Sequence, residues 1–564
     1  MYSSQELTLK IHLNEGHFFL CGKIFLSDVT RRDNLAIGGI VSDELLIVRE
    51  ALEMTVPIVK VKQGRLKGIA VKNVDGGEYL AFRGVPYAAP PIGDLRFKVI
   101  LFSWSGLRDA GCAFPKAIQL DFLAGIMTGS EDCLYLNVAT TSLIDKRPVI
   151  VWIHGGGFLS GSPANDLYGP DYLLKGNIVF VGITYRLGCF GFLNLDLPDA
   201  AGNQGLKDQV AALRWVRENI QAFGGDPDNV TIFGESAGAA AVHLIAMSPL
   251  AQGLFHKVII VSGVANNPWV IDADPVKNAL KFAEAAGMET NDREEALKYL
   301  MTLSSTELME TQRKMDCANL AFKLFFHFAP SVDRSSLEPF MPQSPNEPTM
   351  NYGVNVPLLL GFMSDEGIMM TISPTGLSFR AINEDFAADL ASDLRIPDVE
   401  RLANVAQSIR KFYFDEGPIT LEEHKYAYAQ LKGDVHFVNG IQQMVDIQSA
   451  KNTPTYLFRF SYRPSYPTLS GLFKNDVEGT CHTEDLGAIF HSEFLMPGQP
   501  HQKGTTDHLV MQRMTRMLTN FAKTGYSFGP SIQYYRILKI KRDTELHFYI
   551  NILCSAIRPR SWMK

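Results

Sequence analysis

The sequence predicts an α/β fold with a mostly parallel central sheet, flanked by helices and carrying helical insertions. Short runs rich in Val and Ile recur along the 564 residues, as expected for strands buried on both faces. Segments between them show helical spacing, which gives the strand–helix–strand order of parallel sheets. Hydrophobic residues make up 46% and charged residues 20% of the chain. These values exclude a disordered chain or a coiled coil.

Six segments are expected to form strands of this sheet. In chain order they are Arg147–Ile153, Asn177–Thr184, Asn229–Phe233, Lys257–Val261, Val356–Gly361 and Pro454–Phe460. Between the second and third strands, Leu206–Phe223 has the apolar spacing of a helix that ends at a glycine pair. The charged segment from about Pro275 to Met315 predicts a helical insertion. Because the strands are spread along most of the chain, we expect one large domain.

Charge, cysteine content and hydropathy exclude several classes of protein. The net charge is −7, and no basic stripe marks a nucleic-acid surface. The seven cysteines form no C-x-x-C pair, so we expect no metal site and no cofactor. Their odd number favours a reducing compartment. No apolar run of the length needed to span a membrane occurs, and the N-terminus does not resemble a secretory signal. We therefore expect a cytoplasmic monomer, or an extracellular protein if the true N-terminus differs.

A nucleophile motif, Gly234–Gly238, reads Gly-Glu-Ser-Ala-Gly. It directly follows the predicted strand that ends at Phe233 and opens the predicted helix Ala239–Met247. A serine on such a strand–turn–helix elbow is held in a tight turn that requires small flanking residues. An ordinary glycine-rich turn is the alternative reading. We predict that Ser236 is a nucleophile at the tip of this turn.

A glycine-rich segment, His154–Phe158, follows the predicted strand that ends at Ile153. Its three glycines leave backbone N–H groups free to face a ligand. A serine that attacks a carbonyl needs such donors for the oxyanion, and the N–H after the nucleophile, at Ala237, is a further candidate. A phosphate-binding loop fits less well because no Lys follows at the required spacing.

A serine nucleophile also needs a base and an acid, which follow it along the chain in this arrangement. Glu366 and Asp365 both lie straight after the strand Val356–Gly361, and the residues alone favour neither. For the base, His482 lies in a loop after the last predicted strand. The rival histidines are His424, His436, His491, His501 and His508.

The chain resembles the type-B carboxylesterase and cholinesterase family from about Val56 to about Gly525. The resemblance rests on the elbow and on six further motifs. They are Phe82–Ala88, Gly93–Phe97, Ser130–Asn137, Tyr185–Gly188, Gly202–Gln209 and Phe223–Pro227. It implies the α/β-hydrolase fold and a Ser-Glu-His triad that cleaves esters.

The resemblance also assigns individual residues. The implied triad is Ser236, Glu366 and His482, with oxyanion donors at Gly156, Gly157 and Ala237 and supporting residues Glu235 and Ser262. It implies two internal ion pairs, Arg83 with Glu131 and Arg186 with Asp208. Cys112 and Cys133 fall where secreted members form a disulfide, whereas in an intracellular member they would be free thiols.

Two features refine the expected substrate. Residues 113–132 contain no Trp, so the cation–π site of cholinesterases is not expected. Glu235 stands where juvenile hormone esterases typically have Gln. The chain is most like insect intracellular α-type carboxylesterases, which implies a serine carboxylesterase for small carboxylic esters, including xenobiotics. The alternatives are a dedicated juvenile hormone or lipid ester hydrolase, and a slow-turnover protein that sequesters esters or organophosphates.

Three segments depart from the family pattern. Residues 1–53 have no counterpart, and Met54 resembles a family start. Lys98–Ser103 replaces a proline-rich run, and residues from about 530 to 564 are atypical. These departures indicate an imperfectly assigned gene sequence. We expect an N-terminal extension, 1–53, followed by one domain, 54–564.

Overall fold

This computed structural model describes most of the chain between Val56 and Tyr526. The described residues are 56–98, 103–112, 114–121, 125–317, 326–345, 347, 353–371, 376–415, 417–472 and 477–526. The chain divides into two units, and the first, Met1–Thr55, lies outside the described residues. The atypical segment from about 530 also lies outside them. All of the described residues belong to the second unit, Val56–Lys564.

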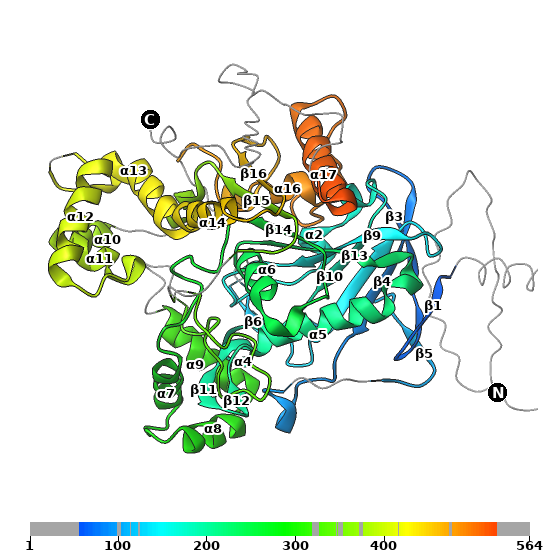
Figure 1. Ribbon diagram of the computed structural model, residues 1–564, viewed down its shortest axis with the longest axis horizontal. Coiled ribbons are helices and arrows are strands. Elements are labelled where there is room, and N and C mark those ends of the chain that lie inside the picture. Colours follow the sequence, from blue (N-terminus) through cyan, green and yellow to red (C-terminus); the bar gives the residue numbers. More distant parts are fainter. Residues whose placement is uncertain are drawn as a thin grey trace, which may run out of the picture. The chain divides into compact units, whose positions relative to one another are not determined.

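A mixed nine-stranded sheet forms the centre of this unit (Figure 1). Its strands, in spatial order, are β16 (Thr455–Phe460), β15 (Leu358–Met363), β14 (Lys257–Val261), β13 (Gly225–Glu235), β9 (Arg147–Ile153), β10 (Val179–Ile183), β8 (Tyr135–Thr140), β4 (Glu78–Pro86) and β3 (Ile69–Lys72). Neighbours from β16 to β10 pair in parallel, whereas β8, β4 and β3 pair antiparallel. All six predicted strands are confirmed, and the antiparallel edge is additional.

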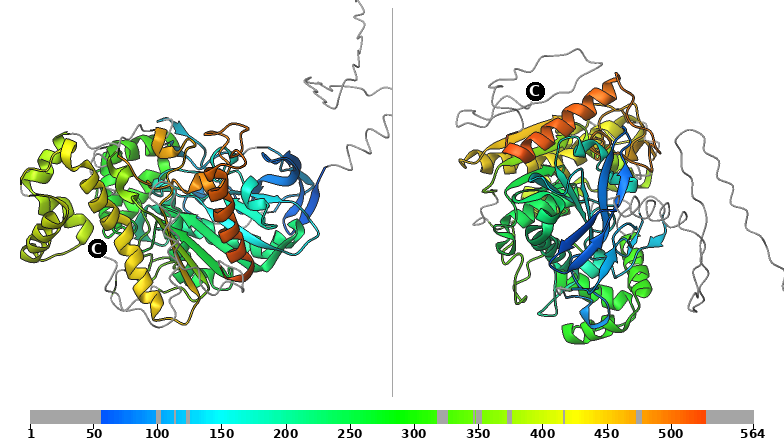
Figure 2. Two further views of the ribbon diagram at one scale, coloured as in Figure 1. Left: turned by 90° about the horizontal axis from the view of Figure 1, so that it is seen from above. Right: turned by 90° about the vertical axis from the view of Figure 1, so that its right-hand side faces the viewer.

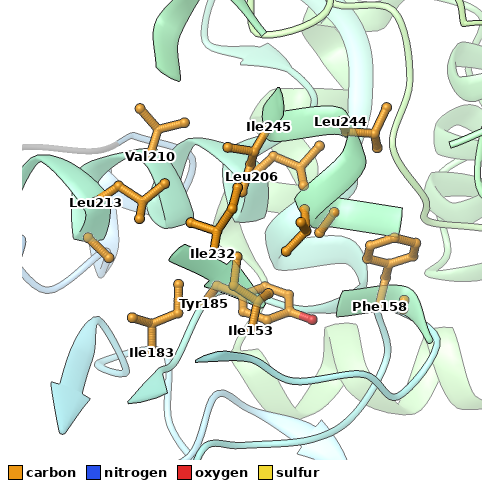
Figure 3. Packing of buried hydrophobic residues seen from close by; sticks show 14 of the residues in the cluster. Ile153, Phe158, Ile183, Tyr185, Leu206, Val210, Leu213, Ile232, Leu244 and Ile245 are labelled. Atoms are coloured by element: carbon orange, nitrogen blue, oxygen red, sulfur yellow. The ribbon is translucent and has the colours of Figure 1, made fainter. Parts of the chain in front are cut away.

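Helices cover both faces of the sheet. In β9, Val149, Val151 and Ile153 belong to the apolar core shared with α5 (Gln204–Asn219) and α6 (Ala237–Met247). Alternate residues such as Trp152 belong to a second core shared with α17 (Thr506–Thr524). Successive side chains of a strand point to opposite faces, so one strand supplies both cores. Figure 3 shows the first of them, with strand residues such as Ile153 and Ile232 facing helix residues such as Leu206 and Ile245.

Two groups of helices are inserted between strands. The predicted insertion after β14 is confirmed as α7 (Pro275–Ala285), α8 (Arg293–Thr302) and α9 (Ser305–Cys317). A second group lies between β15 and β16. It comprises α10 (Gly376–Glu384), α11 (Phe386–Leu394), α12 (Val399–Tyr413), α13 (Leu421–Gly433), the π-helical turn η5 (Asp434–Val438) and α14 (Asn439–Ser449). Helices α10–α12 gather at one end of the unit in Figure 1 and, seen from above, in the left view of Figure 2.

Short elements complete the described chain. The strands are β1 (Ile58–Val61), β2 (Gly64–Lys67), β5 (Leu107–Asp109), β6 (Gln119–Leu120), β7 (Met127–Thr128), β11 (Asn194–Leu197) and β12 (Ala200–Ala201). The helical turns are η1 (Gly93–Leu95), α2 (Asn165–Tyr168), α3 (Asp171–Leu174), α4 (Gly188–Phe192), η2 (Ile220–Phe223), η3 (Pro249–Ala251), η4 (Glu366–Thr371), α15 (Leu469–Leu472) and α16 (Leu486–Ile489). Among the described helices, none is both long and apolar enough to cross a membrane.

The parallel arrangement brings distant segments together. The carboxyl ends of β9, β13, β15 and β16 lie along the same edge of the sheet. The glycine-rich segment, Ser236 and Glu366 directly follow the first three of these strands, and the loop to His482 follows the fourth. Ligands of open α/β sheets bind outside this edge, so the fold gathers all the predicted site residues there.

Candidate active site

Ser236 lies at the sharp turn between β13 and α6. Its φ of 57° and ψ of −126° are strained for a residue with a side chain. A Cβ on Gly234 would lie 2.3 Å from the backbone of Gly238, and one on Gly238 would lie 2.1 Å from the Ile153 carbonyl oxygen. Glycine is therefore required on both sides, as predicted. Ser236 is partly exposed between two buried neighbours.

The glycine-rich loop packs directly against this turn. A Cβ on Gly155 would lie 3.0 Å from the Ser236 Cβ. Gly156 and Gly157 have φ values of 106° and 63°, which lie in the region that favours glycine. Neither the Gly156 N–H nor the Gly157 N–H donates a hydrogen bond to a backbone carbonyl of another described residue. As the first residue of α6, Ala237 also has an N–H without a helical partner.

The neighbouring side chain of His154 supports the loop rather than the reaction centre. Its Nδ1 lies 2.8 Å from the Gly155 carbonyl oxygen, and its ring stacks on that of Tyr185. Burial lowers the pKa of His154 to about 4. The imidazole therefore stays neutral at physiological pH and supports the loop through its contacts with Gly155 and Tyr185.

Glu366 and His482 form a buried hydrogen-bonded pair. The Oε2 atom of Glu366 lies 2.6 Å from Nδ1 of His482. The other oxygen, Oε1, accepts hydrogen bonds from the Ser262 hydroxyl at 2.5 Å and from the Met363 N–H at 2.8 Å. Both carboxylate oxygens therefore have partners, which a buried charge requires. The structure brings the predicted acid, base and supporting serine together.

Asp365, the alternative acid, has a different place. Its Oδ2 accepts the Thr480 N–H at 3.0 Å, and the Asp365 N–H donates to the Thr480 carbonyl at 3.0 Å. Asp365 thus holds the loop at Thr480, two residues before His482. The geometry resolves the alternative that the residues left open: Glu366 contacts the imidazole and Asp365 fixes the loop.

The rival histidines have partners elsewhere. His424 accepts the Thr420 N–H, His436 lies 3.4 Å from Asp393, His491 contacts Glu493, and His501 contacts the Gly487 carbonyl. His508 lies on α17, near its N-terminal end. Only His482, of these six, contacts the predicted acid in the described part of the chain.

Further buried carboxyl groups surround the imidazole. Oε1 of Glu235 lies 3.2 Å from Nε2 of His482. Burial lowers the pKa of His482, but the charges of Glu235 and Glu366 outweigh it and raise the pKa to about 9. Burial raises the pKa of Glu235 to about 7, while His482 opposes the shift. The surroundings therefore favour the imidazolium form of His482.

Asp485 and Phe437 were missed by the sequence reasoning. Burial raises the pKa of Asp485 well above its ordinary value, and Glu235 and Glu366 add to this shift. The Phe437 ring lies 4.6 Å from the His482 ring, centroid to centroid. Asp485 stands three residues after His482, so its position could have been noted; nothing in the local pattern points to Phe437.

One prediction from the family resemblance needs correction. Glu131 pairs with Arg96, at 2.7 Å, and not with Arg83. Arg96 lies in the 3₁₀ turn region after β4, where its guanidinium also reaches two backbone carbonyls of the α8 region. By contrast, the predicted pair of Arg186 with Asp208 is confirmed, with a closest distance of 2.7 Å and both side chains buried.

The structure also bears on the disulfide that the resemblance left open. Cys112 and Cys133 are free thiols, the first exposed and the second buried. Cys133 lies against the buried Arg186 and Phe190, and burial raises the pKa of its thiol. An exposed and a fully buried thiol face different surroundings. In the described part of the chain, no group of three or more His, Cys, Asp or Glu side chains could hold a metal ion.

Comparisons with known proteins identify the family of the chain. The model of the "Carboxylesterase family" matches residues 55–551. Esterase E4 of Myzus persicae is 35% identical over 73% of this chain and 76% of its own length. Liver carboxylesterase of Sus scrofa is 32% identical over 85% of this chain and 87% of its own length.

A solved structure extends the comparison to the fold. Juvenile hormone esterase from Manduca sexta, with OTFP covalently attached, superposes with a TM-score of 0.75 and 30% identity. The match covers 84% of this chain and 91% of that one. The chain therefore belongs to the carboxylesterase family: it has the α/β-hydrolase fold and is a carboxylic ester hydrolase.

Proposed function

We propose that the chain hydrolyses neutral carboxylic esters through an acyl-enzyme intermediate, with Ser236 as nucleophile, His482 as general base and Glu366 as the acid that orients it. The observation that carries this proposal is the 2.6 Å contact between Glu366 and His482. It occurs at the same sheet edge as the strained serine turn.

In the acylation step, the Ser236 hydroxyl attacks the ester carbonyl while Nε2 of His482 takes the hydroxyl proton. In the neutral form of His482, Glu366 holds the Nδ1–H group of the imidazole, which leaves Nε2 as the acceptor. The developing imidazolium is stabilised by the charges of Glu366 and Glu235, the same charges that raise its pKa. His482 then gives the proton to the leaving alcohol.

The carbonyl oxygen becomes an oxyanion during this attack. The N–H groups of Gly156, Gly157 and Ala237 are the proposed donors, because the glycine loop packs against the Ser236 turn. Removing one such donor typically costs about 3 kcal/mol of barrier stabilisation. In the deacylation step, water attacks the acyl-enzyme and His482 again acts as base, which releases the acid and regenerates Ser236.

The surroundings favour an apolar acyl group. Aromatic rings pack side by side next to the glycine loop: Trp269 lies 6.4 Å from Phe158, 6.2 Å from Phe326 and 6.0 Å from Phe437, between ring centroids. A Cβ on Gly157 would lie 2.8 Å from the Phe326 ring. An environment of this kind discriminates weakly between apolar groups, which supports a broad range of esters.

A dedicated juvenile hormone esterase is the second candidate, supported by the structural similarity to the Manduca sexta enzyme. A substrate panel separates the two. A broad esterase turns over naphthyl acetate, naphthyl butyrate and juvenile hormone with kcat/KM values of similar order. A dedicated enzyme prefers juvenile hormone by several orders of magnitude.

The test of the mechanism is Ser236→Ala. The variant should lose hydrolysis of naphthyl acetate to background, while circular dichroism and the melting temperature stay near those of the unchanged protein. Retained turnover in a folded Ser236→Ala protein contradicts the proposal. A burst of one equivalent of naphthol without steady turnover by the unchanged protein would instead indicate a sequestering protein.

A further inference from the structure

Helices α13 and α14, which lie between β15 and β16, are joined by a π-helical turn next to the candidate active site. Here α13 passes into α14 through Asp434–Val438, and the Asn439 N–H binds the Asp434 carbonyl five residues earlier. This is the one π-helical segment in the described part of the chain. Single π turns inside α-helices are uncommon and often occur at functional sites.

The turn lies against both the proposed acid and the proposed base. A Cβ on Gly433, just before the turn, would lie 2.9 Å from the Gly367 nitrogen and 3.7 Å from the Glu366 Cβ. Within the turn, the Phe437 ring lies 4.6 Å from the His482 ring at an angle of 37°. The π turn and the residue before it therefore contact both members of the Glu366–His482 pair.

Two side chains stabilise the π-helical turn, which is wider than a turn of α-helix, by hydrogen bonds to its backbone. The Trp269 indole N–H donates to the His436 carbonyl at 2.8 Å, and the Asn267 amide donates to the Phe437 carbonyl at 3.1 Å. Widening a helix disturbs its regular backbone hydrogen bonds, so carbonyls in the turn become available to outside donors. Asn267 also accepts the Val264 N–H at 2.7 Å, which orients its amide.

A glycine beside the turn, Gly440, leaves room for the Asn267 side chain that binds the turn. A Cβ on Gly440 would lie 2.4 Å from the Asn267 amide nitrogen, so a larger residue there would displace Asn267. The locking residues follow β14 in the same loop that begins with Ser262. That serine donates to Glu366. One loop therefore connects to the proposed acid at one end and to the π turn at the other.

We propose that the π turn Asp434–Val438 is a positioning element that holds Phe437 against the face of the His482 imidazole, with Asn267 and Trp269 as its locks. The proposal rests on the proposed role of His482 as base. The hydrogen bond to Glu366 holds Nδ1 of His482, and Glu235 lies 3.2 Å from Nε2, yet the ring can still rotate about the line through these two atoms. Contact of Phe437 with the ring face limits this rotation and so keeps the geometry that proton transfer needs.

The alternative role of Phe437 is a wall of the substrate pocket, because its ring also lies 6.0 Å from Trp269. The two roles have different kinetic consequences. A wall changes KM and the preference for acyl length. A positioning residue changes kcat for every acyl group, including the smallest, and slows any reaction at Ser236 that needs the base.

The experiment compares Phe437→Leu with Trp269→Phe and with their double variant. Leucine keeps an apolar side chain but has no ring face, and phenylalanine keeps a ring at 269 but has no N–H donor. Phe379→Leu is the matched control, because Phe379 is an equally buried aromatic residue of α10 that packs on Tyr428. Each protein is assayed with phenyl acetate and phenyl butyrate, and for the rate of inactivation by the organophosphate paraoxon.

We expect Phe437→Leu to lower kcat about tenfold for both esters, with KM within twofold and paraoxon inactivation slowed by the same factor. Trp269→Phe should lower kcat less, and the double variant should be no slower than Phe437→Leu, because the lock acts through Phe437. Phe379→Leu should keep the kcat of the unchanged protein.

Unchanged kcat in Phe437→Leu, or a change confined to KM and acyl preference, overturns the positioning role. Additive losses in the double variant overturn the lock. If Phe437→Leu does not fold, Trp269→Phe carries the test through its kcat and paraoxon rates. Failure of the proposed function itself is seen separately, as turnover retained by His482→Ala.

Discussion

The two halves of the site are held in different ways. On the nucleophile side, Ser236 and the glycine loop are fixed by backbone packed on backbone, with glycines at positions where a Cβ would lie 2.1–3.0 Å from a neighbour. On the base side, His482 and Glu366 are fixed by side-chain hydrogen bonds and ring contact. The backbone of the first half has almost no room to move, whereas in the second half single side chains can be exchanged without moving the backbone.

This difference predicts different responses to mutation. A side chain added at a glycine of the nucleophile side must move a central strand or helix, so fold and activity should be lost together. A change on the base side alters charge or orientation in a folded protein, so activity should fall in steps and with a changed pH dependence. The following variants test the contrast.

The largest effect is expected for Gly238→Ala. The new Cβ would lie 2.1 Å from the Ile153 carbonyl oxygen in the central strand β9, a clash that only a backbone shift relieves. We expect at least about 4 kcal/mol of lost unfolding free energy and no measurable esterase activity. Chemical denaturation and a naphthyl acetate assay measure both.

Gly253→Ala is the matched control for this variant. Gly253 has a positive φ, of 77°, which Gly238 lacks, but no atom lies within 4 Å of its Cβ position. Only the conformational strain of about 1 kcal/mol should remain, with full activity. A stable, active Gly238→Ala protein would show that the nucleophile side is more adaptable than we infer.

The next effect is that of Glu366→Gln. An amide in place of the carboxylate loses the charge that stabilises the imidazolium and favours the wrong tautomer of His482. We expect kcat to fall about 10³- to 10⁴-fold, with a melting temperature that still shows a folded protein. Asp365→Asn, in the neighbouring acid, should keep kcat within about tenfold. If Asp365→Asn were the more damaging change, the assignment of the acid would be reversed.

The smallest effect is a shift in pH dependence for Glu235→Gln. His482 accepts a proton only when neutral, so kcat/KM should fall as the pH drops below its pKa, which neighbouring carboxylates raise to about 9. Removing the charge of Glu235 lowers that pKa. The acid limb of kcat/KM for a non-ionisable ester should therefore move to lower pH. A limb that stays in place, or moves upward, contradicts the electrostatic role of Glu235.

The same contrast explains what could be predicted from the sequence. The nucleophile side is built from contiguous motifs, Gly234–Gly238 and His154–Phe158, each directly after a strand. The tight geometry demands glycine at known spacings, so both motifs could be recognised and placed. The main strands were equally predictable, because strands buried on both faces are continuous apolar runs.

The base side is less visible in the sequence. Glu366 and His482 are separated by 116 positions, and no local pattern determines which acid meets which histidine. The residues alone left Asp365 and several histidines open, and only the resemblance chose between them. The π turn lacks a sequence signal for the same reason: Trp269 and Asn267 stabilise it from a distant loop.

One wrong ion pair and one pairing that stayed open show what motifs do not determine. Arg83 and Arg96 both belong to motifs of the resemblance, and the structure pairs Glu131 with Arg96. Cys112 and Cys133 matched the positions of a disulfide, yet their thiols differ completely in exposure. Partner choice depends on side-chain direction and depth, which spacing along the chain does not determine.

The most direct test of the central claim is to identify the nucleophile that an organophosphate modifies covalently. The protein is treated with an organophosphate inhibitor, digested with trypsin and analysed by fragment mass spectrometry. The tryptic peptide that contains Ser236 spans residues 218–257. We predict one adduct per chain, on Ser236, formed in parallel with loss of esterase activity and absent from Ser236→Ala. An adduct on another residue that accompanies the loss of activity would contradict the account.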